Sequence, residues 1–181
     1  MFIQTEPTPN PASMKFLPGR TVMEHGVADF PEAAKAEEAS PLARRLFGVD
    51  GVAGVYLGHD FITVTKDDGL DWHGLKPLVL GAIMEHFMSG EPVVVAEALP
   101  DEAAHDPADD EVVKQIRELI DTRVRPAVAQ DGGDIVFHGF ERGVVYLHMR
   151  GACSGCPSSV VTLKNGIENL LRYYVPEVAE V

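Results

Sequence analysis

Apolar residues recur along the chain in two patterns: short alternating runs that predict strands, and runs spaced by three or four that predict helices. Between these patterned parts, residues 97–110 lose all apolar periodicity and are rich in acidic residues, alanine and proline. That composition is typical of an extended, self-repelling linker. The sequence therefore predicts an α+β protein of two small α+β domains, residues 1–96 and 111–181, joined by a flexible acidic linker over residues 97–110.

The N-terminal part begins with two short strand patterns on either side of Thr8-Pro9-Asn10-Pro11. Its prolines force a turn, because each fixes its own φ and biases the preceding residue away from helix. Residues 24–39 are acidic and weakly periodic, and they predict a loop with one helical turn. Two β-branched runs around a short turn, residues 52–57 and 61–65, predict a hairpin. Val93-Val94-Val95 predicts a last strand.

Two helix starts carry capping signals. Ser40 followed by Pro41 predicts a short helix that Gly48 ends. Asp71 can cap a longer helix that Gly90 closes. One face of this longer helix is apolar: Trp72, Leu75, Val79, Ile83 and Phe87.

The C-terminal part predicts an amphipathic helix over residues 112–124, interrupted near Pro126, and then a turn at Asp131-Gly132-Gly133-Asp134. Residues 135–141 and 144–150 predict a hairpin across Arg142-Gly143. A final helix and a terminal strand at residues 178–181 complete the second unit. The helix is marked by apolar residues spaced by three or four: Val160, Leu163, Ile167, Leu170, Leu171 and Tyr174.

Charge and composition narrow the function classes. The formal net charge of −13 makes nucleic acid and anionic membranes poor partners. No apolar run is long enough to span a bilayer, and the first residues resemble neither a secretory signal nor an Arg-rich transit peptide. We therefore expect a bacterial cytoplasmic protein, with a mature mitochondrial matrix protein as the alternative. No paired-carboxylate, Ser/His/Asp or phosphate-loop pattern is present, and we expect no enzymatic activity.

Cys153 and Cys156 are the two cysteines of the chain, and they lie where the last predicted strand gives way to the last predicted helix. Backbone N–H groups and the helix dipole favour negative charge at such a turn, which favours the metal-binding thiolate form. Two cysteines are too few for a disulfide framework. A Cys-x-x-Cys in a reducing compartment predicts a metal-binding or redox-active pair.

The longer motif Gly151-Ala152-Cys153-Ser154-Gly155-Cys156-Pro157-Ser158-Ser159, together with Asp131-Gly132-Gly133-Asp134 and the hairpin, resembles the NifU C-terminal, or Nfu-type, iron–sulfur carrier domain. The N-terminal part resembles the Nfu N-terminal domain. That second resemblance rests on residues 8–11, 16–19, 60–65 and 85–87.

The resemblance implies an iron–sulfur cluster scaffold or carrier that accepts a [4Fe–4S] cluster from an assembly scaffold and passes it to apo-enzymes. Such clusters are typically held by four thiolates, and one chain offers Cys153 and Cys156. We therefore expect one cluster shared by a homodimer, across a two-fold axis. The N-terminal domain has no ligand set, and we expect it to recognise partners or tune dimerisation.

Three other interpretations of the cysteines remain open. The pair is half of a zinc site completed by His138 and His148, a thioredoxin-like dithiol, or two buried structural thiols. Nearby polar residues also have more than one interpretation. Asp131 and Asp134 suit a turn, a cation site or an acid/base role. Arg150 and Lys164 suit a solvated surface or neutralisation of a cluster's charge.

Overall fold

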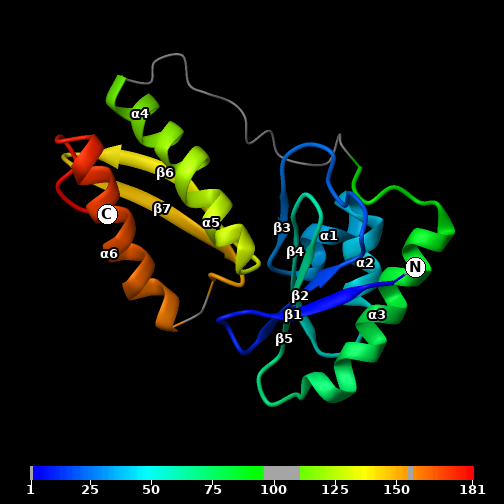
Figure 1. Ribbon diagram of the computed structural model, residues 1–181. Coiled ribbons are helices and arrows are strands. Elements are labelled where there is room, and N and C mark those ends of the chain that lie inside the picture. Colours follow the sequence, from blue (N-terminus) through cyan, green and yellow to red (C-terminus); the bar gives the residue numbers. More distant parts are fainter. Residues whose placement is uncertain (1, 96–110, 155–156) are drawn as a thin grey trace.

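A computed structural model describes residues 2–95, 111–154 and 157–181 (Figure 1). Among the described residues the buried apolar side chains form two clusters, one within residues 16–83 and one within residues 116–178. Each cluster is enclosed by its own helices and strands. This confirms an α+β protein of two domains. The linker expected at residues 97–110 lies outside the described residues, so the domain boundaries remain a prediction.

The N-terminal domain is built on a five-stranded antiparallel sheet in the order β1-β2-β5-β4-β3. Figure 1 shows its three helices gathered on one side of that sheet. The strands are β1 (Gln4–Pro7), β2 (Ser13–Leu17), β3 (Ala28–Phe30), β4 (Val52–Leu57) and β5 (Ile62–Lys66). The helices are α1 (Ala33–Ala39), α2 (Pro41–Phe47) and α3 (Trp72–Ser89).

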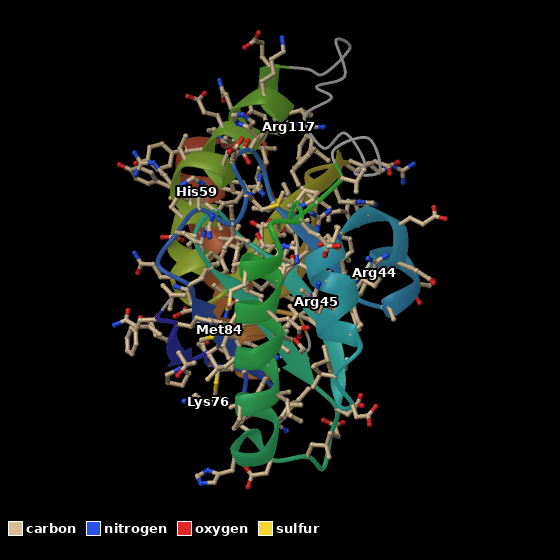
Figure 2. All side chains as sticks on the ribbon, turned by 90° about the vertical axis from the view of Figure 1, so that its right-hand side faces the viewer. Arg44, Arg45, His59, Lys76, Met84 and Arg117 are labelled. Atoms are coloured by element: carbon tan, nitrogen blue, oxygen red, sulfur yellow. The ribbon has the colours of Figure 1, made fainter. Side chains whose placement is uncertain are left out.

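The predicted caps are confirmed. The Ser40 side chain accepts a hydrogen bond from the Ala43 N–H at 3.0 Å, with Pro41 in the first helical position of α2. The Asp71 carboxylate accepts one from the His73 N–H at 2.9 Å at the start of α3, and Gly90 ends α3 with a φ of 75°. Figure 2 views α2 and α3 from outside, where Arg45 of α2 reaches Glu85 of α3 at 3.3 Å.

Two predictions for this domain are wrong. Residues 24–39 form strand β3 and helix α1, because the alternate residues Ala28 and Phe30 are buried in the core. Val93–Val95 does not join the sheet. It packs irregularly against the helices, where Ala39 and Ser40 bond its backbone.

The C-terminal domain packs helices against one hairpin. Strands β6 (Gly133–Glu141) and β7 (Val144–Gly151) pair antiparallel across a turn at Arg142 and Gly143, both with positive φ, as predicted. The helical elements are α4 (Glu111–Leu119), the π-helical turn η2 (Ile120–Val124), α5 (Arg125–Gln130) and α6 (Pro157–Tyr174).

Pro126 widens the helix rather than ending it. Its ring nitrogen has no hydrogen to donate, and in the turn before it the Arg125 N–H bonds to the Ile120 carbonyl, five residues back. The helix then continues to Gln130, beyond the expected interruption. The strand predicted at residues 178–181 is reduced to a single parallel bridge between Val144 and Glu180.

Candidate functional site

Cys153 lies where the sequence predicts, on the turn between the end of β7 at Gly151 and the start of α6 at Pro157. Its side chain is 4% exposed and belongs to the core of the C-terminal domain. Cys156, the second predicted ligand, lies outside the described residues. The geometry of the pair as a ligand set therefore remains a prediction.

The turn that precedes β6 packs directly against Cys153. A Cβ on Gly133 would overlap the Cys153 Sγ and would lie 2.9 Å from the Cys153 backbone nitrogen. Only a residue without a side chain fits at this close approach. The Asp131–Asp134 motif therefore forms one wall of the cysteine turn, a role that its position about twenty residues upstream did not reveal.

Asp134 is neither a turn cap nor a cation ligand here, because Arg125 occupies both of its carboxylate oxygens. The Nε and Nη2 atoms of Arg125 donate to Asp134 at 2.8 and 2.9 Å, and Asp134 is 3% exposed. Burial lowers the pKa of Arg125, but the hydrogen bonds and charge of Asp134 outweigh it and raise that pKa overall. The bidentate pair fixes α5 to the first residues of β6.

The phenol of Tyr56, from strand β4 of the other domain, lies close enough to Asp134 to interact with its charge. Burial of the phenol, followed by the charge of Asp134, raises the pKa of Tyr56, which is 2% exposed. Tyr56 therefore stays a neutral phenol beside a carboxylate that is already paired with an arginine.

Between the described residues of the two domains, three hydrogen bonds each end on a backbone carbonyl close to the cysteine turn. The Thr63 hydroxyl donates to Gly132 at 2.7 Å and the Lys15 ammonium donates to Gln130 at 3.2 Å. The Asn10 amide donates to Ser154, the residue after Cys153, at 3.2 Å. Sequence reasoning missed these contacts, because the polar alternation in β2 and β5 is typical of a sheet face that is open to water.

The histidines proposed to complete a zinc site lie on the hairpin, and both are exposed. His148 is opposite Val136 in the β6–β7 register, and His138 sits at a register shift of β6. Within residues 2–95, 111–154 and 157–181, no three His, Cys, Asp or Glu side chains converge as a metal site.

The two cations expected near the turn differ in position. Arg150 is half-buried and lies opposite Asp134 in the β6–β7 register. Lys164 of α6 instead lies 3.9 Å from the Glu180 carboxylate, near the C-terminus. Arg150 is therefore the cation that lies beside the cysteine turn. Over the described parts of the chain, no helix has the length and apolar character needed to cross a membrane.

Comparisons with known proteins agree with the resemblance seen in the sequence. The family described as "Scaffold protein Nfu/NifU N terminal" matches residues 3–90, and the family described as "NifU-like domain" matches residues 116–181. The human protein "NFU1 iron-sulfur cluster scaffold homolog, mitochondrial" is 54% identical over all of this chain and 71% of its own length. The Drosophila sechellia protein of the same name is 55% identical over all of this chain and 64% of its own length.

Among solved structures, the solution NMR structure of a NifU-like protein from Saccharomyces cerevisiae is 27% identical. It covers 52% of this chain and 84% of its own, with a TM-score of 0.41. The relatives also correct one expectation from the sequence. A bacterial cytoplasmic location is wrong on this comparison, because the matched human and Drosophila relatives are named as mitochondrial.

Proposed function

The chain belongs to the Nfu/NifU family of scaffold proteins, and from that premise we propose that it is an iron–sulfur cluster carrier and not an enzyme. Its cargo is a [4Fe–4S] cluster held between two copies of the chain, with Cys153 and Cys156 as the ligands of each copy. The carrier accepts the cluster from an assembly scaffold and passes it to apo-enzymes. The names of the relatives favour a mitochondrial setting, the alternative foreseen from the sequence.

The number of thiols is the observation that carries this proposal. A cluster of this kind takes four thiolates, and the chain contains two cysteines. Two copies related by a two-fold axis supply the full set with the same surface of each chain. Because each copy contributes only half of the ligands, an acceptor's thiolates can replace them in steps, which suits transfer better than permanent storage.

The cysteine turn supplies part of the chemistry. The start of α6 at Pro157 directs backbone N–H groups and the positive end of the helix dipole toward the turn, which favours thiolate. Cys153 packs into the core beside Gly133, so its thiol has to turn outward to act as a ligand. Removal of that thiol from apolar surroundings also favours its ionisation.

Anaerobic reconstitution with iron and sulfide tests the proposal. The products are analysed for iron, sulfide and zinc, and their mass in solution is measured. We expect about four irons and four sulfides per two chains. Zinc without sulfide favours the structural module, and disulfide reduction of an insulin-type substrate without metal favours the dithiol oxidoreductase. Either outcome would contradict the carrier function and favour that alternative in its place.

A further inference from the structure

One face of the N-terminal sheet is polar and yet buried. Lys15, Thr63 and Tyr56 lie side by side across β2, β5 and β4, because Lys15 pairs with Thr63 and Thr63 pairs with Tyr56 in the strand registers. Thr63 is 1% exposed and Lys15 is 8% exposed. An antiparallel sheet with helices on one face normally leaves its polar face to water. Here that face is covered by the C-terminal domain.

The surface that covers this face consists of the cysteine turn and of the turn before β6 that packs against it. We call Asn10, Lys15, Tyr56 and Thr63 the polar face. Asn10, Lys15 and Thr63 donate hydrogen bonds to Ser154, Gln130 and Gly132 of the other domain, in that order, and Tyr56 interacts with the charge of Asp134. A buried ammonium and a buried hydroxyl without such partners would be costly. The polar face is therefore matched to the C-terminal domain, which supplies hydrogen-bond partners for its buried groups.

The backbone of the turns is shaped for the same contact. A Cβ on Gly132 would come within 2.9 Å of the Thr63 Oγ1 and 3.3 Å of the Thr8 Cγ2. A Cβ on Gly151 would come within 3.1 Å of the Tyr56 Cγ. Both glycines have positive φ as well. Because neither residue has a side chain, the backbone at Gly132 and the backbone at Gly151 pack directly against the polar face.

We propose that the polar face is a docking surface for the chain's own cysteine turn, and that it competes with a second copy of the chain for that turn. The proposal rests on the proposed function, since the shared cluster is what brings in the second copy. Asn10 holds the carbonyl of the residue next to Cys153, and Cys153 itself points into the core. A cluster bridging two chains brings their two cysteine turns within the width of one cluster. The N-terminal domain of each chain has to separate from the cysteine turn before the two turns can meet.

Residues 97–110 separate the two domains in sequence. Residues 97–110 can span at most about 50 Å when fully extended. The docked form thus covers the cysteine turn until a cluster arrives, and the opened form exposes both that turn and the polar face.

Lys15 reports directly on docking, because its ammonium donates to Gln130 of the C-terminal domain and also contacts Glu6 and Phe61 of its own domain. Its rate of acylation by an amine-reactive ester, resolved by peptide mass spectrometry, follows the open fraction. Lys114, with a side chain 56% exposed, gives the rate of an accessible lysine in the same sample. Anaerobic loading with iron and sulfide, followed by native mass spectrometry, gives the rate of cluster-dependent dimer formation.

Thr63→Val and Tyr56→Phe each remove one hydroxyl from the contact and keep the shape of the side chain. Thr63→Val should raise both rates by about three- to tenfold, the effect of one lost hydrogen bond, and Tyr56→Phe should raise both rates as well. Thr65→Val on the same strand, whose hydroxyl bonds Ser13 within the domain, and Tyr146→Phe, which is exposed on β7, should change neither rate. In the wild-type chain, cluster loading itself should make Lys15 as reactive as Lys114.

Three results would overturn the proposal. The first is a Lys15 that reacts as fast as Lys114 in the unloaded wild-type chain, and the second is a Lys15 that stays protected in the loaded dimer. The third is a variant that speeds Lys15 acylation without speeding dimer formation. A chain that takes up no cluster at all would overturn the proposed function instead, while Lys15 in the unloaded chain still decides whether the domains dock.

Discussion

The Arg125 guanidinium donates two hydrogen bonds, of 2.8 and 2.9 Å, to the Asp134 carboxylate. This pair holds helix α5 against strand β6, which packs against the cysteine turn. Asp121 adds a longer contact of 3.4 Å to the same arginine, and Tyr56 reaches the same carboxylate from the other domain. The pair therefore links the stability of the C-terminal domain to the surface on which the two domains meet.

Arg125→Lys should destabilise the C-terminal domain by about 2 kcal/mol, because an ammonium cannot make both bonds to a buried carboxylate. Urea unfolding followed by circular dichroism measures this loss. Fluorescence of Trp72, the single tryptophan, follows the N-terminal domain separately. As a control, Arg172→Lys should stay within about 0.5 kcal/mol of the wild-type chain, because the Arg172 side chain that pairs with Glu168 is 56% exposed. Equal losses for the two variants would contradict this role.

Gly133→Ala should impair the cysteine turn, because the new methyl group would occupy the position of the Cys153 Sγ. We expect a loss of about 1–3 kcal/mol from overpacking and a several-fold lower yield of cluster after anaerobic loading. Gly139→Ala, on the same strand with nothing within 4 Å of the new Cβ, should load like the wild-type chain. Normal stability and normal loading of Gly133→Ala would show that Cys153 does not depend on this close approach.

His86 should make the N-terminal domain less stable in acid. Its side chain is fully buried in α3, and burial, with Arg45 and Arg20 nearby, lowers the pKa of its imidazole despite the opposing charge of Glu91. The folded domain thus binds a proton less readily than the unfolded chain. Stability is complete above the ordinary pKa of 6.5 and falls as the pH drops below it toward the folded pKa.

His86→Leu should remove that slope, measured by Trp72 fluorescence in urea at a series of pH values. His73→Leu, at an exposed position of the same helix, should keep it. If the wild-type chain and His86→Leu lose stability equally between pH 7 and about pH 5, then the acid sensitivity comes from other groups.

Much of the secondary structure follows from local signals. The β4–β5 and β6–β7 hairpins, the caps at Ser40 and Asp71 and the helix end at Gly90 each depend on a few adjacent residues, and each was predicted. Strand β3 was missed because three residues are too few for their alternation to be recognised, and they pair with β4, far along the chain. Val93–Val95 was assigned to a strand because its composition is β-branched, although no partner strand lies beside it in the described sheet.

The candidate site, too, was predicted where adjacent residues determine it and missed where distant contacts do. The position of Cys153 at a strand-to-helix turn follows from the patterns that flank it. The inward packing of its side chain depends on Gly133, and the cover over the turn depends on Asn10, whose bond to Ser154 joins residues 144 positions apart. Contacts of that separation leave no periodicity in a single sequence, so neither feature could be predicted.

Native mass spectrometry of the anaerobically loaded chain tests the central claim most directly. The account predicts a species of two chains and one [4Fe–4S] cluster, and it predicts that Cys153→Ser and Cys156→Ser each abolish both the bound cluster and the dimer. A single chain that carries a complete cluster, or either serine variant that still forms the loaded dimer, would contradict it.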